Sequence, residues 1–275
     1  MFSPEVRCHS RLKRYDEAMQ QPQHSLSDDP PLRRGSRVAF FGGSFDPPHL
    51  GHLAIARAAR DAFHLDAVLF APVGAQPLKP EGSAASFADR LAMTRLAIDG
   101  EPGFAVSLAD APKHPESDPA APNYTIDTLK ALRAALASDS VLYCLMGADS
   151  FFGLRKWHRA AEIPFVATLI VAWRPGQPLE NLREALPQGL ALTPVGDKFE
   201  SGIEVRSLLL TNSSGESAQL HVLPNLDIEI SASALRSSMR AGQNTASESL
   251  PGAISLPDPV ANYIRSHRLY GVSRR

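Results

Sequence analysis

The sequence has few of the features that mark exported or membrane-bound proteins. Among its 275 residues are two cysteines, Cys8 in a polar leader and Cys144 in an apolar run, which excludes a disulfide framework and a cysteine-rich zinc site. The longest apolar run, residues 165–173, is far shorter than the roughly 18 residues that a membrane-spanning helix needs. Residues 1–14 lack the apolar core of a secretory signal. We therefore expect a cytoplasmic protein with no membrane partner.

An excess of charge of either sign is also missing. The chain has 28 Lys and Arg against 29 Asp and Glu, a formal net charge of −1 at pH 7. Proteins that work by covering nucleic-acid phosphates or anionic lipid carry a strong positive excess, so we expect no nucleic-acid partner. Any anion-binding site in this chain must be local.

The composition divides the chain into a leader and one domain. Residues 1–35 are polar and have hardly any large apolar side chains, which is typical of a flexible segment. We expect residues 36–275 to form a single domain with a small C-terminal helical part over about 226–275. Its hydrophobic residues, 44% of the chain, suffice for a sizeable core.

From residue 38 onward, short continuous apolar runs, typical of buried strands, take turns along the chain with segments of helix length. This β-α alternation predicts the α/β class, with a doubly wound parallel sheet and helices on both faces. Residues 175–227 are not assigned, apart from an exposed loop over 211–217, because Gly, Pro, Ser and Asn interrupt the runs. The expected strands are 38–41, 67–71, 104–107, 141–146 and 165–173, order is expected to return over 226–230, and the expected helices are 50–63, 87–98, 125–136, 150–161, 233–239 and 259–268.

The densest cluster of unusual residues is GGSFDPPHLGH at 42–52, where the first strand meets the first helix. Ligands bind at this carboxyl edge of open α/β sheets. The glycines let backbone N–H groups approach a phosphate, and a helix N-terminus adds partial positive charge. His49 and His52 fall on one helical turn, so both imidazoles can donate hydrogen bonds to a polyphosphate.

Each residue of this cluster also has a plain structural interpretation. A glycine pair after a strand is often only a turn, and a single histidine is more often structural than functional. The joint occurrence of these residues at one strand-to-helix junction favours a phosphate site. The pattern is neither the Walker A loop nor the dinucleotide fingerprint GxGxxG, so these two phosphate-binding classes are excluded.

Two separated motifs resemble the H-x-G-H nucleotidyltransferases, a superfamily with a Rossmann-like fold that transfers a nucleotide from ATP to a phosphate. Residues 42–52 match its first motif, and ISASALR at 230–236 is similar to its second. The intervening NYTIDTL at 123–129, and Gly147-Ala148-Asp149 with Trp157, resemble the nicotinate mononucleotide adenylyltransferases in particular. Arg174-Pro175-Gly176 and the C-terminal segment 257–270 are also similar to this family. One departure is Leu78, where the family usually has histidine.

The resemblance implies transfer of AMP from ATP to nicotinate mononucleotide, with release of pyrophosphate, in NAD biosynthesis. We expect Mg²⁺ to be bound with ATP and not at a metal site of the protein itself, since the sequence shows no cluster of carboxylates of the kind that binds hard cations. The implied catalytic residues are His49, His52 and Arg236. The implied ATP-binding residues are Gly42, Gly43, Ser44, Phe45, His49, His52, Asp149, Ser231, Ser233 and Arg236. The implied mononucleotide-binding residues are Lys79, Tyr124, Thr125, Trp157 and Arg174.

Several of these assignments have structural alternatives. Ser231 and Ser233 bind phosphate or cap a helix, and Asp149 binds a ribose or serves as an N-cap. Trp157 stacks on the pyridine ring or packs in the core, and Lys79 meets phosphate or solvent. Asp46, which could be a general base or magnesium ligand, is favoured as a cap of backbone N–H groups.

Two other functions compete with the one that the resemblance implies. A sister adenylyltransferase would use nicotinamide mononucleotide or phosphopantetheine, and Tyr124-Thr125 and Trp157 weigh against it. A non-catalytic nucleotide-binding regulator would use the same phosphate cradle without turnover. His49, His52 and Arg236 favour turnover.

Overall fold

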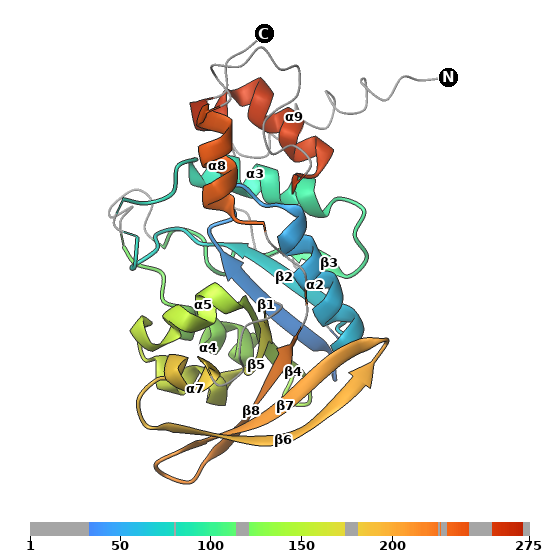
Figure 1. The fold of residues 1–275 in the computed structure, drawn as a ribbon, viewed down its shortest axis with the longest axis vertical. Coiled ribbons are helices and arrows are strands. Elements are labelled where there is room, and N and C mark those ends of the chain that lie inside the picture. Colours follow the sequence, from blue (N-terminus) through green and yellow to red (C-terminus); the bar gives the residue numbers. More distant parts are fainter. Residues whose placement is uncertain are drawn as a thin grey trace.

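The fold is an eight-stranded sheet with helices on both faces (Figure 1). The structure is a computed structural model, and it describes residues 33–79, 81–113, 121–173, 181–224, 226, 230–241 and 255–271. The strand order is β3-β2-β1-β4-β5-β8-β7-β6. The strands are β1 (Arg37–Gly43), β2 (Ala67–Pro72), β3 (Phe104–Val106), β4 (Val141–Gly147), β5 (Thr168–Ala172), β6 (Leu190–Glu200), β7 (Ile203–Asn212) and β8 (Ser217–Leu223).

Strands β1 to β5 and β8 form the parallel part of the sheet, as the β-α alternation predicts. The last two strands in the order, β7 and β6, run antiparallel as a hairpin. Ser201 and Gly202 join them, and both have positive φ, as a two-residue hairpin turn of the I′ type requires.

The helices lie in two layers because alternate residues of the buried strands point to opposite faces of the sheet. Phe41 of β1 belongs to an apolar cluster that includes residues of α2, α3, α8 and α9, whereas Phe40 belongs to a second cluster with residues of α4, α5, α6 and α7. The helices are α2 (Leu50–Phe63), α3 (Phe87–Ile98), α4 (Thr125–Ala135), α5 (Ala148–Gly153), α6 (Ile163–Val166), α7 (Asn181–Ala185), α8 (Ala232–Ala241) and α9 (Asp258–His267), with the short 3-10 turns η1 (Leu154–Lys156), η2 (Ala160–Glu162) and η5 (Leu269–Gly271).

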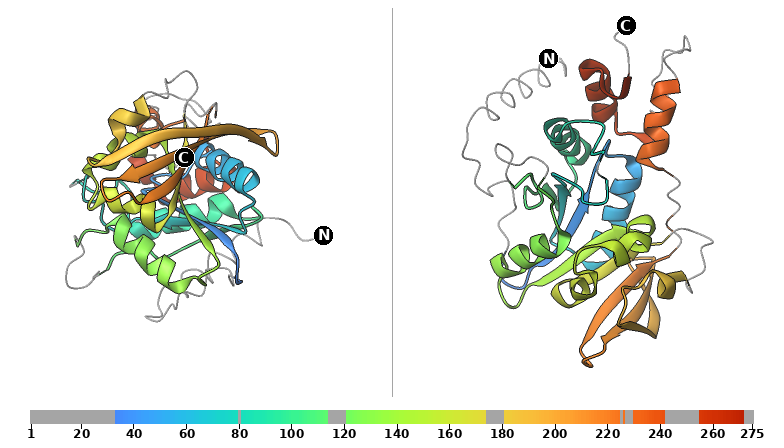
Figure 2. Two further views of the ribbon diagram at one scale, coloured as in Figure 1. Left: turned by 90° about the horizontal axis from the view of Figure 1, so that it is seen from below. Right: turned by 90° about the vertical axis from the view of Figure 1, so that its left-hand side faces the viewer.

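The chain order places a topological switch between β1 and β4. From β1 the chain winds outward through β2 and β3 with α2 and α3 on one face, and it then returns through β4 and β5 with α4 to α6 on the other. Ligands of doubly wound sheets bind at such a point, at the carboxyl ends of the strands. Figure 2 shows α8 and α9 at this end of the molecule and the β6–β7 hairpin at the opposite end.

Four expectations about elements need correction or fall partly outside the described residues. The single helix expected over 150–161 is wrong: α5 ends at Gly153, and the left-handed Arg159 separates two short turns. The strand expected over 165–173 begins only at Thr168. The loop expected over 211–217 is a short turn, because Thr211 pairs with Ser217. Of the ordered segment expected over 226–230 only Leu226 and Ile230 are described, and neither lies in a helix or strand.

The polar leader predicted over 1–35 lies outside the described residues except at its last three positions. The C-terminal helical part is described over 230–241 and 255–271. Leu235 and Met239 of α8 and Ile264 of α9 share one buried apolar cluster with β1 and α2. The C-terminal helices therefore extend the core of the sheet.

Candidate active site

A cavity of about 1140 Å³ opens at the carboxyl ends of β1 and β4, at the switch point of the sheet. Every site residue predicted from the sequence lines it except Arg174, which lies outside the described residues. The predicted residues that line the cavity are Gly42, Gly43, Ser44, Phe45, His49, His52, Lys79, Tyr124, Thr125, Asp149, Trp157, Ser231, Ser233 and Arg236. Residues far apart in sequence, such as Gly42 and Arg236 at a separation of 194 positions, thus meet at one site.

The loop between β1 and α2, called the β1 loop below, forms one wall of the cavity, and Arg90 of α3 holds this loop in place. The buried guanidinium donates from Nη1 to the Ser44 carbonyl and from Nη2 to the Val73 carbonyl, both at 2.8 Å. These bonds tie the β1 loop to the end of β2. The sequence analysis did not single out Arg90. Its position among the apolar residues of the helix expected over 87–98 could have indicated a buried arginine.

His49 and His52 lie at the start of α2 with their rings stacked, the centroids 3.7 Å apart. The His49 backbone N–H donates to His52 Nδ1 at 3.1 Å, so neutral His52 carries its proton on Nε2. Burial lowers the pKa of His49 to about 4. Burial, and then the neighbouring His49, lower the pKa of His52 well below its usual range. Near pH 7 both imidazoles are therefore neutral hydrogen-bond donors and not cations.

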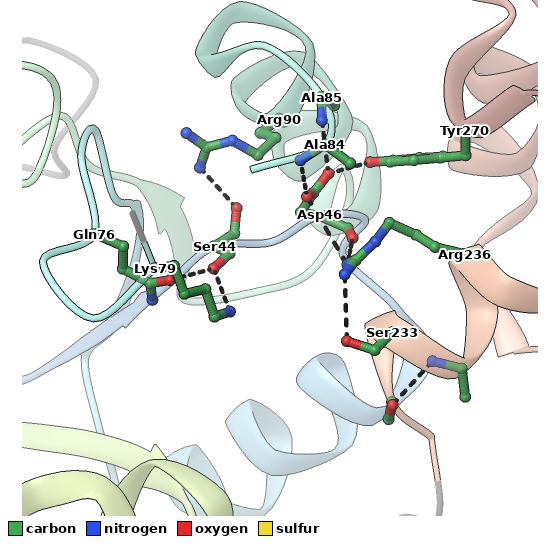
Figure 3. A network of polar contacts seen from close by, with 12 residues as sticks. Ser44, Asp46, Gln76, Lys79, Ala84, Ala85, Arg90, Ser233, Arg236 and Tyr270 are labelled. Atoms are coloured by element: carbon green, nitrogen blue, oxygen red, sulfur yellow. Dashed lines mark hydrogen bonds and ion pairs between the residues drawn. The ribbon is translucent and has the colours of Figure 1, made fainter. Parts of the chain in front are cut away.

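Asp46, in the loop between β1 and α2, is the centre of a polar network (Figure 3). Its buried carboxylate accepts hydrogen bonds from the backbone N–H groups of Ala84 at 2.6 Å and Ala85 at 3.1 Å, and from the Tyr270 hydroxyl at 2.7 Å. These donors give Asp46 a structural role, as the sequence favoured. It caps backbone N–H groups that precede α3 and joins them to the C-terminal η5.

Arg236 of α8 reaches the same loop from the opposite side. Its Nη1 donates to the Asp46 carbonyl at 2.6 Å and its Nη2 to Ser233 Oγ at 3.2 Å. Ser231 Oγ accepts from the Ala234 N–H at 3.1 Å, so the capping role that the sequence left open for Ser231 is present.

Lys79 lies on the loop after β2, facing Ser44. Its Nζ donates to Ser44 Oγ at 3.4 Å, and Ser44 Oγ donates to Gln76 Oε1 at 3.2 Å. Leu78, at the position where the resemblance led us to expect histidine, is 51% exposed. The loop therefore brings one cation to the wall of the cavity that the loop between β1 and α2 forms.

The other wall is aromatic. Tyr124, the N-cap residue of α4, lies with its ring centroid 4.3 Å from that of His158. Trp157 is half-buried and packs at the edge of the apolar cluster under β4. Asp149 is exposed in the first turn of α5, where Gly147 is the N-cap, so the N-cap alternative for Asp149 is wrong.

The aromatic wall is braced by Asn123, which sequence reasoning noted only as part of a motif. Its Oδ1 accepts from the Ala75 N–H at 3.0 Å, and its Nδ2 donates to the Ala111 carbonyl at 2.9 Å. The backbone approaches closely here, because a Cβ on Gly74 would lie 2.5 Å from the Pro112 nitrogen. Asn123 thus joins the loop after β2 to the chain that leads into Tyr124.

Asp110 lies next to the contacts of Asn123, since the Gly74 N–H donates to its backbone carbonyl, and the sequence analysis did not single it out either. Its buried carboxylate accepts a hydrogen bond from the Thr128 hydroxyl at 2.7 Å. Burial raises the pKa of Asp110, while the bond from Thr128 and the charge of Lys113 oppose this shift. The contact ties the chain after β3 to the first turns of α4.

The described part of the chain contains no helix that is both long and apolar enough to cross a membrane.

Comparison with known proteins identifies the family of this chain. Residues 40–237 match the family described as cytidylyltransferase-like. A protein of Citrifermentans bemidjiense named probable nicotinate-nucleotide adenylyltransferase is 35% identical over 234 residues, which cover 85% of this chain and 98% of that protein. A protein of the same name from Trichlorobacter lovleyi is 38% identical over 234 residues, which cover 85% and 99%.

The fold is also found among solved structures. The Plasmodium falciparum nicotinic acid mononucleotide adenylyltransferase matches with a TM-score of 0.59 and 15% identity, over 86% of this chain and 98% of that chain. At this identity the match shows the fold, and it agrees with the Rossmann-like sheet described above. The sequence relationships and the site geometry agree, and the chain belongs to the cytidylyltransferase-like family and, within it, to the nicotinate-nucleotide adenylyltransferases.

Proposed function

We propose that the protein transfers AMP from ATP to nicotinate mononucleotide, forming nicotinate adenine dinucleotide and pyrophosphate in NAD biosynthesis. One observation carries this proposal: the phosphate-facing residues His52 and Arg236 and the aromatic residues Tyr124 and Trp157 line a single cavity. The names of the relatives support the same reaction. The structural neighbour from Plasmodium falciparum was solved in complexes with NaAD and with APC, which also agrees with it.

In the proposed reaction a phosphate oxygen of the mononucleotide attacks the α-phosphorus of ATP. The bond from this phosphorus to the oxygen that bridges to the β-phosphate breaks, and pyrophosphate leaves with the electron pair. Negative charge grows on the transferring and leaving groups, so fixed donors and cations accelerate the reaction without a protein nucleophile. We assign these roles to His52 Nε2–H, to His49 and to the guanidinium of Arg236, which all line the cavity.

The ATP half of the site lies along the β1 loop and α8. We assign the phosphates to the backbone N–H groups of residues 42–45, to the two histidines and to Arg236. Asp149 accepts hydrogen bonds from the ribose hydroxyls, and Ser231 and Ser233 lie beside the β- and γ-phosphates.

The mononucleotide half lies along the aromatic wall. The pyridine ring stacks on Trp157, and backbone N–H groups at Tyr124 and Thr125 hold the carboxylate of the nicotinate. Lys79 neutralises the mononucleotide phosphate. Arg174 belongs to this half by the family resemblance alone, since it lies outside the described residues.

Magnesium enters this proposal as part of MgATP. Among the described residues no group of three or more His, Cys, Asp or Glu side chains is arranged to hold a metal ion. The Asp46 carboxylate is committed to Ala84, Ala85 and Tyr270. In MgATP the phosphate oxygens would hold the ion, and the ion would neutralise part of their charge. We also place the protein in the cytoplasm.

Product analysis tests the proposal. The purified chain is incubated with MgATP and nicotinate mononucleotide, and the dinucleotide is identified by chromatography and mass spectrometry beside measured pyrophosphate. Equimolar formation of both products is expected. Binding of ATP without any product from nicotinate mononucleotide, nicotinamide mononucleotide or phosphopantetheine would instead indicate a regulator.

A further inference from the structure

Tyr270, almost at the end of the described chain, is bonded to the loop of the first motif. Its hydroxyl donates to Asp46 Oδ1 at 2.7 Å across 224 positions of sequence. Tyr270 is 8% exposed and has left-handed backbone angles, φ 58° and ψ 23°. Phe45, next to Asp46, is also left-handed, with φ 46°. Such angles are unfavourable outside glycine and persist where the surroundings enforce them, often at functional sites.

The Tyr270 bond completes the coordination of the Asp46 carboxylate. Two backbone N–H groups and the hydroxyl occupy its oxygens, and Arg236 Nη1 stays 3.8 Å from Oδ2. The guanidinium donates instead to the Asp46 backbone carbonyl, at 2.6 Å. Arg236 is therefore near the carboxylate but has no direct hydrogen bond to it.

The opposite charges of the Asp46 carboxylate and the Arg236 guanidinium favour a shorter contact between them. A buried carboxylate that loses one donor attracts the nearest cation strongly, because water does not replace the donor. The nearest cation here is Arg236, and a direct charge-assisted hydrogen bond to Asp46 would use an N–H that the phosphates need. Burial, and then the charge of Asp46, raise the pKa of Tyr270 above its usual range, so the hydroxyl keeps its proton.

We propose that Tyr270 is a positioning residue for adenylyl transfer: its hydroxyl keeps the Asp46 carboxylate occupied, so that Arg236 stays available to the phosphates of ATP. This inference rests on the proposed function of the site. Tyr270 lies behind the loop and does not line the cavity, so it acts through Asp46 and Arg236.

The test variant is Tyr270→Phe, which removes the hydroxyl and keeps the ring. Its control is Tyr263→Phe, because Tyr263 of α9 makes a comparable bond, to Asp89 Oδ1 at 3.0 Å, away from the cavity. We expect Tyr270→Phe to raise KM for ATP about tenfold and leave KM for the mononucleotide unchanged. Tyr263→Phe should leave both KM values unchanged. If both variants leave KM for ATP unchanged, or raise it equally, Tyr270 is only structural and the inference is wrong.

A double-mutant cycle of Tyr270→Phe with Arg236→Ala tests whether Tyr270 affects ATP affinity through Arg236. If Tyr270 acts through Arg236, Tyr270→Phe has little further effect on ATP affinity once Arg236 is alanine. Full additivity of the two changes would overturn the inference. ATP titration by calorimetry measures this cycle without turnover. Failure of the wild-type chain to form product would therefore contradict the proposed function, while the titrations would still decide the role of Tyr270.

Discussion

The imidazoles of His49 and His52 stack with their centroids 3.7 Å apart, and the His49 backbone N–H donates to His52 Nδ1. This bond fixes the tautomer of His52 and leaves Nε2–H as its donor. Since burial keeps both rings neutral near pH 7, the contribution to catalysis that we propose for them is hydrogen bonding to phosphate oxygens.

Replacement of His52 by alanine should therefore lower kcat strongly and ATP affinity less, because the charge on the phosphates is largest in the transition state. Loss of one such donor typically costs on the order of 10²- to 10³-fold in rate. Steady-state kinetics and ATP titration measure both effects, with circular dichroism to confirm folding. His267→Ala, at an exposed histidine away from the cavity, is the control. A folded His52 variant with near wild-type kcat would make the histidine structural.

Trp157→Ala should raise KM for nicotinate mononucleotide about tenfold or more, since stacking of a nucleotide ring on an aromatic side chain contributes about 1–3 kcal/mol. KM for ATP should change much less. The other tryptophan, Trp173, is 2% exposed but also lines the cavity, so steady-state kinetics measures the effect and fluorescence quenching does not. An unchanged KM for the mononucleotide would assign Trp157 to packing.

Gly74→Ala should destabilise the fold and weaken mononucleotide binding. A Cβ at this position would lie 2.5 Å from the Pro112 nitrogen and 2.8 Å from Asn123 Oδ1, so the brace that leads to Tyr124 must shift. Gly147→Ala is a matched control for stability, because its Cβ would meet only Ile55 Cδ1, at an ordinary 3.9 Å. Thermal unfolding of the two variants is compared, and equal melting temperatures would contradict the steric argument.

Stability should fall as the pH is lowered from about 6.5 to 4, partly through His221 of β8. Burial, more than the charges of Lys198 and Arg37, lowers the pKa of His221 to about 4 from 6.5. Between pH 6.5 and 4 the unfolded chain binds more protons at this histidine than the folded chain does. The contribution of neutral His221 to stability is therefore complete above pH 6.5 and is lost as the pH falls towards 4.

The variant His221→Gln keeps a polar partner for Ser207 and removes this titration. Between pH 7 and 4.5 it should lose about 2–3 kcal/mol less unfolding free energy than the wild type. Denaturant unfolding at both pH values measures the difference, with the exposed His267→Gln as control. Parallel losses in wild type and His221→Gln would contradict the assignment of the pKa.

The sequence predicted the elements around the site closely because their signals are local. The helices expected over 50–63 and 87–98 have these bounds in the structure, and the motif at 42–52 lies on the cavity. In contrast, β6 is an exposed strand at the end of the sheet with Pro194 and a bulge, so it lacks the apolar run of a buried strand.

Residues that act through long-range contacts were outside the reach of sequence patterns. Arg90 bonds to Ser44 across 46 positions and Tyr270 to Asp46 across 224. No periodicity or motif relates such partners, because only the folded chain brings them together. The sequence therefore predicted the residues that line the cavity better than those that hold them in place.

Pyrophosphate release from MgATP, with each acceptor offered separately, tests the central claim most directly. If the site is built for nicotinate mononucleotide, kcat/KM with this acid should exceed that with nicotinamide mononucleotide, and phosphopantetheine should give no release above background. The account is contradicted if the amide mononucleotide reacts with equal or greater kcat/KM, or if no acceptor yields product.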